Sequence, residues 1–476
     1  MSSTTLAEIS RLDLLDLSTP PLASITDVKH LSSYNWIEAP TPTIAVPGSP
    51  PIWSAPSAPH QVKKDSGLIY IAQNAARHPD SPLEPLFRAL YITDPSFDVR
   101  SIDIVTDRNN IRKLLSFVNP SSTRNGLQTF TINIEVAENT AIFSRAETAT
   151  HEFIGLHEFR GFGHEFEKAY TTSQISGSTG HHRIISYRFG DLNFIVRYEA
   201  DGYLDAGTRI PSSHSKEPES DSLSSILGSL SLSPTNRPPD ITTTGSKLTI
   251  KSEGKVIPLE STLEIKTRVF HKPLEIEEIA PQLWVSQTFK LVRAYHRNGT
   301  FQTPEVEDVA ASIKRWEERN QKDLRKLASL INKIITIVKE CGGNAIVEYD
   351  MKEDKLVIRK GAGKKMLPKD LYSRWDDKDS SEAESKPGHG AEAESAMKPA
   401  DGVETNAEGK SIVFGPAGTK GNKAVEAAKS REQTLLDNLL PNRTLPKDID
   451  SDSQDNRGKD LACDSRETLS SFSYTR

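Results

Sequence analysis

The chain has 476 residues, a net charge of −6 and a mean hydropathy of −0.50. This length allows one large catalytic domain with tails, and a hydrophobic fraction of 36% indicates that a substantial part of the chain does not fold. The net charge excludes a global basic field. Any nucleic acid would therefore be attracted by local basic patches or by a bound metal.

Two cysteines, Cys341 and Cys463, argue against a disulfide scaffold and against a structural zinc site, and they fit a reducing compartment. The N-terminus lacks a basic stretch followed by an apolar run. No apolar segment approaches the roughly 18 residues that a membrane-spanning helix needs. We therefore expect a protein that is neither secreted nor membrane-spanning.

The first 60 residues are rich in Ser, Thr and Pro, and the proline run at 40–51 predicts extended backbone. Because Tyr34, Trp36 and Trp53 are too apolar for a free linker, we expect an ordered strap laid over the domain, with disorder of residues 1–60 as the alternative. The catalytic domain is predicted to span residues 61–376.

Inside this domain, residues 101–106 predict a strand and residues 109–117 a helix. Residues 128–136 alternate strictly between apolar and polar, as a half-buried strand does. Residues 205–245 interrupt the pattern and predict a disordered insertion. Its short apolar stretch, Ile226–Leu232, is either a transient helix without a role or a docking peptide for a partner.

A long helix is predicted from Thr303, which can act as the N-cap, to the glycine pair Gly342–Gly343. A core helix is favoured over a coiled-coil dimer because a hairpin follows, with strands at 345–349 and 356–359. The charged, aperiodic tail at 377–476 predicts disorder. The fold class is α/β (α+β), with a mixed central sheet flanked by helices.

Acidic residues occur in pairs with a spacing of two at the ends of predicted strands. Glu199 and Asp201 follow an apolar strand, and a period of two predicts that both lie on one face. The same period aligns Glu264 with Lys266. If the two strands are adjacent, three carboxylates and one ammonium lie within a few ångströms. Either pair alone is more often a solvated face.

Three close carboxylates repel each other and raise one another's pKa unless a cation neutralises them. Oxygen ligands suit Mg²⁺ or Mn²⁺ rather than zinc. Such a metal polarises a phosphate and generates hydroxide from water, while Lys266 steadies the attacking water or the developing charge. Glu167, in a helical run, would complete the metal shell. The chemistry indicated is phosphodiester or pyrophosphate hydrolysis.

Five fragments in this order resemble the motifs of the decapping and exoribonuclease (DXO-like) family, over about residues 95–360 without the insertion. They are Arg108 after a short strand, Glu167 in Gly163–Glu167, Glu199 and Asp201 with Ala200 between them, Glu264 and Lys266 before Thr267, and Gln287 before Thr288–Phe289.

This resemblance implies a PD-(D/E)XK nuclease-like fold and metal-dependent decapping, pyrophosphohydrolase or 5′-to-3′ exoribonuclease activity on RNA 5′ ends. It implies that Glu167, Asp201 and Glu264 ligate Mg²⁺ or Mn²⁺ and that Glu199 contacts the metal through water and takes part in catalysis. Lys266 and Gln287 would position nucleophile and phosphate. Arg108 would bind RNA phosphate, and Glu167 and Gln287 would also lie at the substrate.

The resemblance also implies a nuclear or cytoplasmic location, with the nucleus favoured, and a 5′-to-3′ exoribonuclease as a protein partner. Three features depart from the family pattern: Asn109 follows the motif arginine, His164 replaces an apolar residue, and 63 positions separate Asp201 from Glu264. A catalytically inactive RNA-binding or scaffold relative of the same fold is therefore the alternative function.

Two site residues have structural alternatives. Arg108 can instead form a surface ion pair with Asp107 or another neighbouring acid. Gln287 lies on the same predicted helix face as Leu283 and Leu291, so it can instead be a buried amide that makes a structural hydrogen bond.

Overall fold

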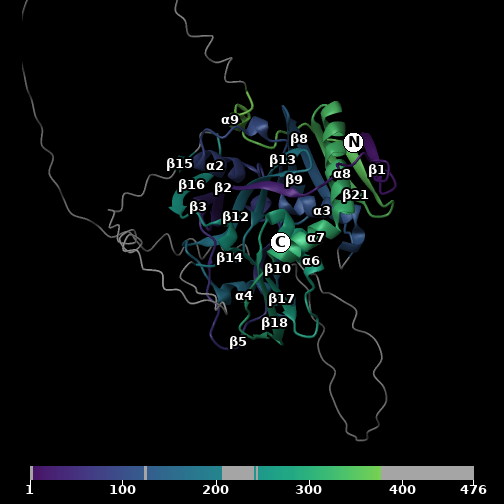
Figure 1. Ribbon diagram of the computed structural model, residues 1–476. Helices are drawn as coiled ribbons and strands as arrows, with labels where there is room; N and C mark the ends of the chain where they lie inside the picture. The colour runs from purple at the N-terminus through teal and green to yellow at the C-terminus, as the bar shows by residue number, and fades with distance from the viewer. Residues whose placement is uncertain (1–3, 123–125, 206–240, 243–244, 377–476) are drawn as a thin grey trace, which may run out of the picture. The chain divides into compact units, whose positions relative to one another are not determined.

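The computed structural model describes residues 4–122, 126–205, 241–242 and 245–376. Within these residues the chain is a mixed α+β domain, in which helices pack against mixed sheets (Figure 1). The predicted fold class is confirmed. Nearly all of the predicted insertion and the whole of the predicted tail lie outside the described residues.

The larger sheet has twelve strands among the described residues. In spatial order they are β1 (Thr5–Ser10), β22 (Lys355–Lys360), β21 (Asn344–Asp350), β8 (Thr131–Ala137), β9 (Thr140–Ala146), β7 (Ile104–Asp107), β13 (Leu192–Glu199), β12 (Ser178–Phe189), β2 (Ile25–Ile37), β3 (Thr43–Gly48), β16 (Thr249–Gly254) and β15 (Ile241–Thr242). β7 runs parallel to both of its neighbours, β9 and β13, so the carboxyl ends of three strands meet at one edge.

The second sheet is built from shorter strands. In the described part of the chain they are β11 (Thr171–Thr172), β4 (Ile52–Trp53), β14 (Gly202–Tyr203), β17 (Thr262–Val269), β18 (Lys290–Arg297), β19 (Thr300–Phe301) and β5 (His60–Gln61), with β20 (Val306–Asp308) also paired to β18. β6 (Gly67–Tyr70) and β10 (His151–Ile154) form a separate two-stranded ribbon.

The N-terminal segment is part of both sheets. β2 lies between β12 and β3, and its aromatic residues Tyr34 and Trp36 are fully buried. β1 pairs with β22, the second strand of the predicted hairpin. The apolar residues that argued against a free linker are thus core residues, and the structure places this segment inside the sheets rather than over them as a strap.

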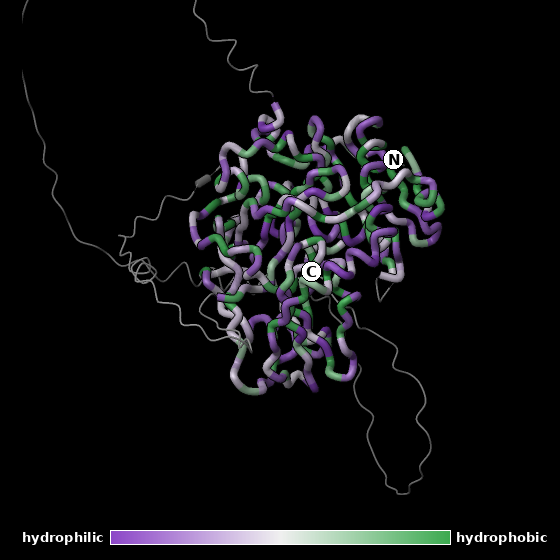
Figure 2. Tube along the Cα trace, viewed as in Figure 1, coloured by the Kyte–Doolittle hydropathy of each residue, from purple (hydrophilic) through white to green (hydrophobic). Residues whose placement is uncertain are grey.

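Side chains of the large sheet alternate between two hydrophobic clusters, as the period of a strand requires. On β7, for example, Ile104 belongs to one cluster and Val105 to the other. Figure 2 shows hydrophobic and hydrophilic residues distributed along the described chain. The first cluster contains residues of α3 (Arg108–Val118), α6 (Ile276–Ser286), α7 (Ala310–Arg319) and α8 (Gln321–Glu340).

The second cluster contains residues of α2 (Glu84–Thr93) and α9 (Lys369–Tyr372), so helices cover both faces (Figure 1). The remaining described helices are α1 (Gln73–Arg77), α4 (Gly163–Tyr170) and three 3-10 turns at Val99–Ser101, Pro120–Ser122 and Leu259–Ser261. None of the described helices combines the length and the apolar character that crossing a bilayer requires.

The prediction of one long helix from Thr303 is wrong at the start of the segment, and the helical part consists of two helices, α7 and α8. Residues 306–308 form β20, because this segment pairs with β18. α7 then ends at Arg319, and Asn320 joins it to α8. The predicted hairpin is confirmed as β21 and β22, and both Gly342 and Gly343 have the positive φ that ends the helix.

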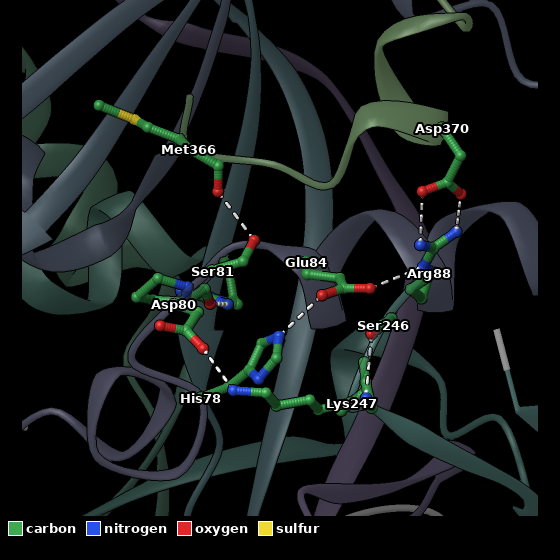
Figure 3. Close-up of polar contacts among 12 residues, drawn as sticks. His78, Asp80, Ser81, Glu84, Arg88, Ser246, Lys247, Met366 and Asp370 are labelled. Carbon is green, nitrogen blue, oxygen red and sulfur yellow. Dashed lines mark hydrogen bonds and ion pairs between the residues drawn. The ribbon is translucent and has the colours of Figure 1, made fainter. Parts of the chain in front are cut away.

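A polar network holds α9 against α2 (Figure 3). The buried carboxylate of Glu84 accepts from Arg88 at 3.0 Å and lies 2.7 Å from His78. Arg88 also donates to both oxygens of Asp370, at 2.5 and 3.0 Å. The Ser81 hydroxyl donates to the carbonyl of Met366. Glu84 is therefore the buried anion on which this network depends.

We predict that Glu84→Ala lowers the free energy of unfolding by about 3 kcal/mol, because buried ion pairs are costly to break from one side. Asp370 is 47% exposed, so Asp370→Ala should cost less than about 1 kcal/mol. Urea titration followed by circular dichroism measures both values. Equal losses in the two variants would contradict the anchoring role of Glu84.

Candidate active site

A pocket lies where the carboxyl ends of β9, β7 and β13 meet. Arg108 and Asn109, which open α3, line it together with Arg145 at the end of β9 and Glu199 at the end of β13. The helix starts directly after the strand because Asp107 is held in place: Arg197 of β13 donates to its two oxygens at 2.7 and 3.0 Å. Ligand sites commonly form at such strand ends.

Behind Arg108 lies the buried carboxylate of Glu264 on β17, which is 1% exposed. Its Oε1 accepts from Lys266 Nζ at 2.6 Å and from the Gln282 amide, and its Oε2 accepts from Arg108 at 3.1 Å. Burial alone would raise the pKa of Glu264, but the nearby Lys266 and Arg108 lower it below its usual range. Glu264 is therefore ionised.

The predicted alignment of Glu264 with Lys266 is confirmed by the 2.6 Å contact, and Leu263 and Ile265 point to the opposite, hydrophobic side. Arg108 does not form the surface ion pair that was the alternative. It is 3% exposed, it forms an ion pair with Glu264, and its guanidinium lies 5.5 Å from the centre of the Tyr198 ring.

Asp201 lies beside this ion pair at the junction of the two sheets. Its Oδ2 accepts from the backbone N–H of Ile265 at 2.8 Å. Burial and the negative charges of Glu264 and Glu167 raise the pKa of Asp201 well above its usual range. The acids of β17, α4 and the segment after β13 therefore repel one another, as close carboxylates do without a cation.

The two acid-bearing strands are not adjacent, contrary to the sequence-based expectation. β13 pairs with β12 and β7 in the large sheet, whereas β17 pairs with β14 and β18 in the second sheet. The chain passes from one sheet to the other at Ala200–Asp201. As a result Glu199 lines the pocket, whereas Asp201 contacts β17.

Glu199 on β13 pairs with His182 of the neighbouring strand β12 and lies near Gln73 of α1. A Cβ at Gly180 would be 2.9 Å from Glu199 Oε1 and 2.5 Å from Gln73 Oε1, so both side chains approach this glycine closely. Gln73 Oε1 also lies 3.0 Å from His182 Nε2, and its amide donates to Thr179. Gln73, His182 and Glu199 thus form one wall of the pocket.

The structure does not bring Gln287 to the acidic cluster. Gln287 follows the last residue of α6 with a φ of 52°, and its amide donates back to the Trp284 carbonyl at 2.5 Å. The amide that contacts Glu264 belongs to Gln282, which is 1% exposed. In the sequence, Gln282 is distinguished only as a polar residue within an otherwise apolar helix face.

Positive charge accumulates around Arg108 and Arg112. Burial, followed by the charge of Arg108, lowers the pKa of Arg112 to about 10, and Arg145 has the same effect. Within the described part of the chain, no three acidic, histidine or cysteine side chains converge into a ready-made metal site. The arrangement is therefore a pair of buried carboxylates beside a cluster of cations.

Residues 9–375 match a family described as Domain of unknown function (DUF8563). This match covers more than half of the chain, which therefore belongs to that family. No curated protein matches the chain in sequence.

Several solved structures are similar to the chain, and they are of the family that the motifs resemble. S. pombe Rai1 in complex with 3′-FADP is 13% identical over 74% of this chain and 99% of that chain, with a TM-score of 0.44. Candida albicans Rai1 in complex with pU5-Mn²⁺ is 12% identical over 79% and 98%, with a TM-score of 0.46.

The chain is also similar to K. lactis Dxo1 in complex with manganese, at 9% identity over 75% of this chain and 98% of that chain, with a TM-score of 0.39. At such identities and scores, activity has to be argued from the site itself.

Gly180→Ala tests the wall of the pocket. The added methyl group would displace the ends of two flexible side chains, Glu199 and Gln73, so we expect a melting temperature within about 4 °C of wild type. A crystal structure of the variant should show both groups moved. Gly155→Ala is the control, since its methyl group would meet other atoms only at 3.8 Å or more. An unmoved Glu199 would contradict the close packing.

Proposed function

We propose that this chain is a divalent-metal-dependent hydrolase that acts on the 5′ ends of RNA. The observation that carries the proposal is the buried Glu264–Lys266 pair, at 2.6 Å, beside a second carboxylate, Asp201, whose pKa is raised by burial and by its acidic neighbours. The resemblance of the motifs favours RNA 5′ ends as the substrate. On the same basis we propose a nuclear location and a 5′-to-3′ exoribonuclease as a protein partner.

The donor chemistry fits Mg²⁺ or Mn²⁺. A carboxylate has about four acceptor positions. Among the described contacts, Asp201 uses one of them and Oε2 of Glu264 accepts one hydrogen bond, so both residues retain capacity for a hard cation. Glu167 is the third acid. When bound, the cation would polarise a phosphoryl oxygen and lower the pKa of water.

The protein's own groups have separate tasks in this proposal. Arg108 and Gln282 hold Glu264 in one orientation, and Lys266 places an ammonium where charge develops on the phosphate. Arg108 also lines the pocket with Arg145, and these two arginines attract the phosphates of the substrate. Glu199 faces the same pocket and would orient water or the metal's hydration shell.

A catalytically inactive RNA-binding relative is the second candidate. The contacts of Glu264 favour this second candidate, because a carboxylate that accepts from three donors can also be part of a purely structural ion pair. A structural role explains the burial of Glu264. It does not explain why Asp201 and Glu167 lie close enough to raise the pKa of Asp201.

Hydrolysis of 5′-triphosphate, unmethylated-cap and 5′-monophosphate RNA, with Mn²⁺ or EDTA, tests the proposal. We expect products only with the metal, and a loss of at least about 100-fold in Asp201→Asn and Glu264→Gln. Both variants keep the side-chain shape, and their melting temperatures serve as the control for folding. No turnover by a folded wild-type protein that still binds RNA would establish the inactive relative.

Gln282 and Gln287 can be separated by mutation. Gln282→Met removes the amide that holds Glu264, and we expect turnover to fall by about 10- to 100-fold. Gln287→Gly removes the other amide at a position whose φ of 52° suits glycine, and should change turnover by less than about threefold. The reverse order would assign the site amide to Gln287.

A further inference from the structure

Four side chains share one face of the β6–β10 ribbon. Leu68 pairs with Phe153 and Tyr70 pairs with His151, so all four project from the same side. On the opposite side, Ile154 is 3% exposed and anchors the ribbon. We call Leu68, Tyr70, His151 and Phe153 the ribbon face.

The ribbon face exposes large apolar groups. Phe153 is 72% exposed and Leu68 is 53% exposed. The chain that follows β10 adds Leu156, at 88%, and Phe159, at 54%. Adjacent exposed apolar side chains of this size are uncommon on a surface without a partner.

The ribbon face ends at the pocket of the candidate active site. Tyr70 and the next residue, Ile71, both line that pocket. The backbone N–H groups of Ile71 and Ala72 donate to the Thr150 carbonyl, each at 2.9 Å, which fixes the end of the ribbon against the pocket wall. The ribbon face therefore extends along the surface from the pocket.

Cations lie over two of these aromatic rings, one on β6 and one in the chain that follows β10. Lys64 Nζ is 5.5 Å from the centre of the Phe159 ring, and the Arg77 guanidinium is 5.0 Å from that of Tyr70. Exposed aromatic rings with neighbouring cations are the features by which proteins bind single-stranded nucleic acid, through stacked bases and paired phosphates.

We propose, on the basis of the proposed function, that the ribbon face and Phe159 bind the nucleotides that follow the 5′ end of a single-stranded RNA. The 5′ end enters the pocket at Tyr70. The next bases stack on Phe153 and Phe159, and Lys64 lies near the backbone phosphates. Continuity with the pocket and the cations on the rings favour this occupant over a protein.

The test is the affinity for fluorescein-labelled RNA of twelve nucleotides and of two nucleotides, measured by anisotropy in EDTA so that hydrolysis does not interfere. In Phe153→Thr/Phe159→Thr we expect the Kd of the longer RNA to rise by about tenfold or more, with that of the dinucleotide unchanged. Met351→Ala, at a side chain that is 54% exposed on the β21–β22 turn, is the control.

Melting temperatures of the variants show whether folding is intact. Unchanged affinity for the longer RNA would overturn the proposal and leave the proposed function standing. Loss of self-association with unchanged RNA affinity would identify the ribbon face as an interface between copies and also overturn it. If wild type does not hydrolyse RNA but the double variant still loses affinity for the longer RNA, the proposed function fails and the RNA surface stands.

Discussion

The ionised carboxylate of Glu264 is the interaction on which the candidate site depends. It is almost fully buried, and its two oxygens are held by an arginine, a lysine and an amide from three parts of the chain. Because a buried charge is tolerated only when it is paired and hydrogen-bonded, this carboxylate fixes the first residue of α3, the middle of α6 and the face of β17 together.

After β13 the chain passes from the large sheet to the second sheet, so the two acids of this short segment, Glu199 and Asp201, have different roles. Glu199 ends the strand within the large sheet and lines the pocket, whereas Asp201 has already passed to the second sheet and contacts β17. Small residues permit this crossing. A Cβ at Gly202 would be 3.2 Å from the Pro51 carbonyl, and a Cβ at Gly180 would contact Glu199. Acid groups two positions apart thus face different surroundings, which a regular strand would not allow.

The sequence predicts local features of this site better than its assembly. A period of two was enough to align Glu264 with Lys266, because that relation lies within one strand. It could not show that the strands of Glu199 and Glu264 belong to different sheets, since pairing depends on contacts between distant segments. The contact of Gln282 with Glu264 was not predicted, because the sequence does not show which group a single amide in an apolar helix contacts. The helix from Thr303 failed because pairing of β20 with β18 overrides local helix signals.

The electrostatics of the site bear on the choice between an enzyme and an inactive relative. Burial raises the pKa of Asp201, and so do the charges of Glu264 and Glu167, whose repulsion a bound cation would relieve. Burial lowers the pKa of Arg112, and so do the charges of Arg108 and Arg145, whose repulsion a bound anion would relieve. Since Glu264 contacts Arg108 and influences both groups, the two positions are adjacent. A purely structural ion pair already balances its own charges, so it requires neither an added cation beside Asp201 nor an added anion beside Arg108. In the proposed function, a phosphate bound through a divalent cation would supply both charges at once.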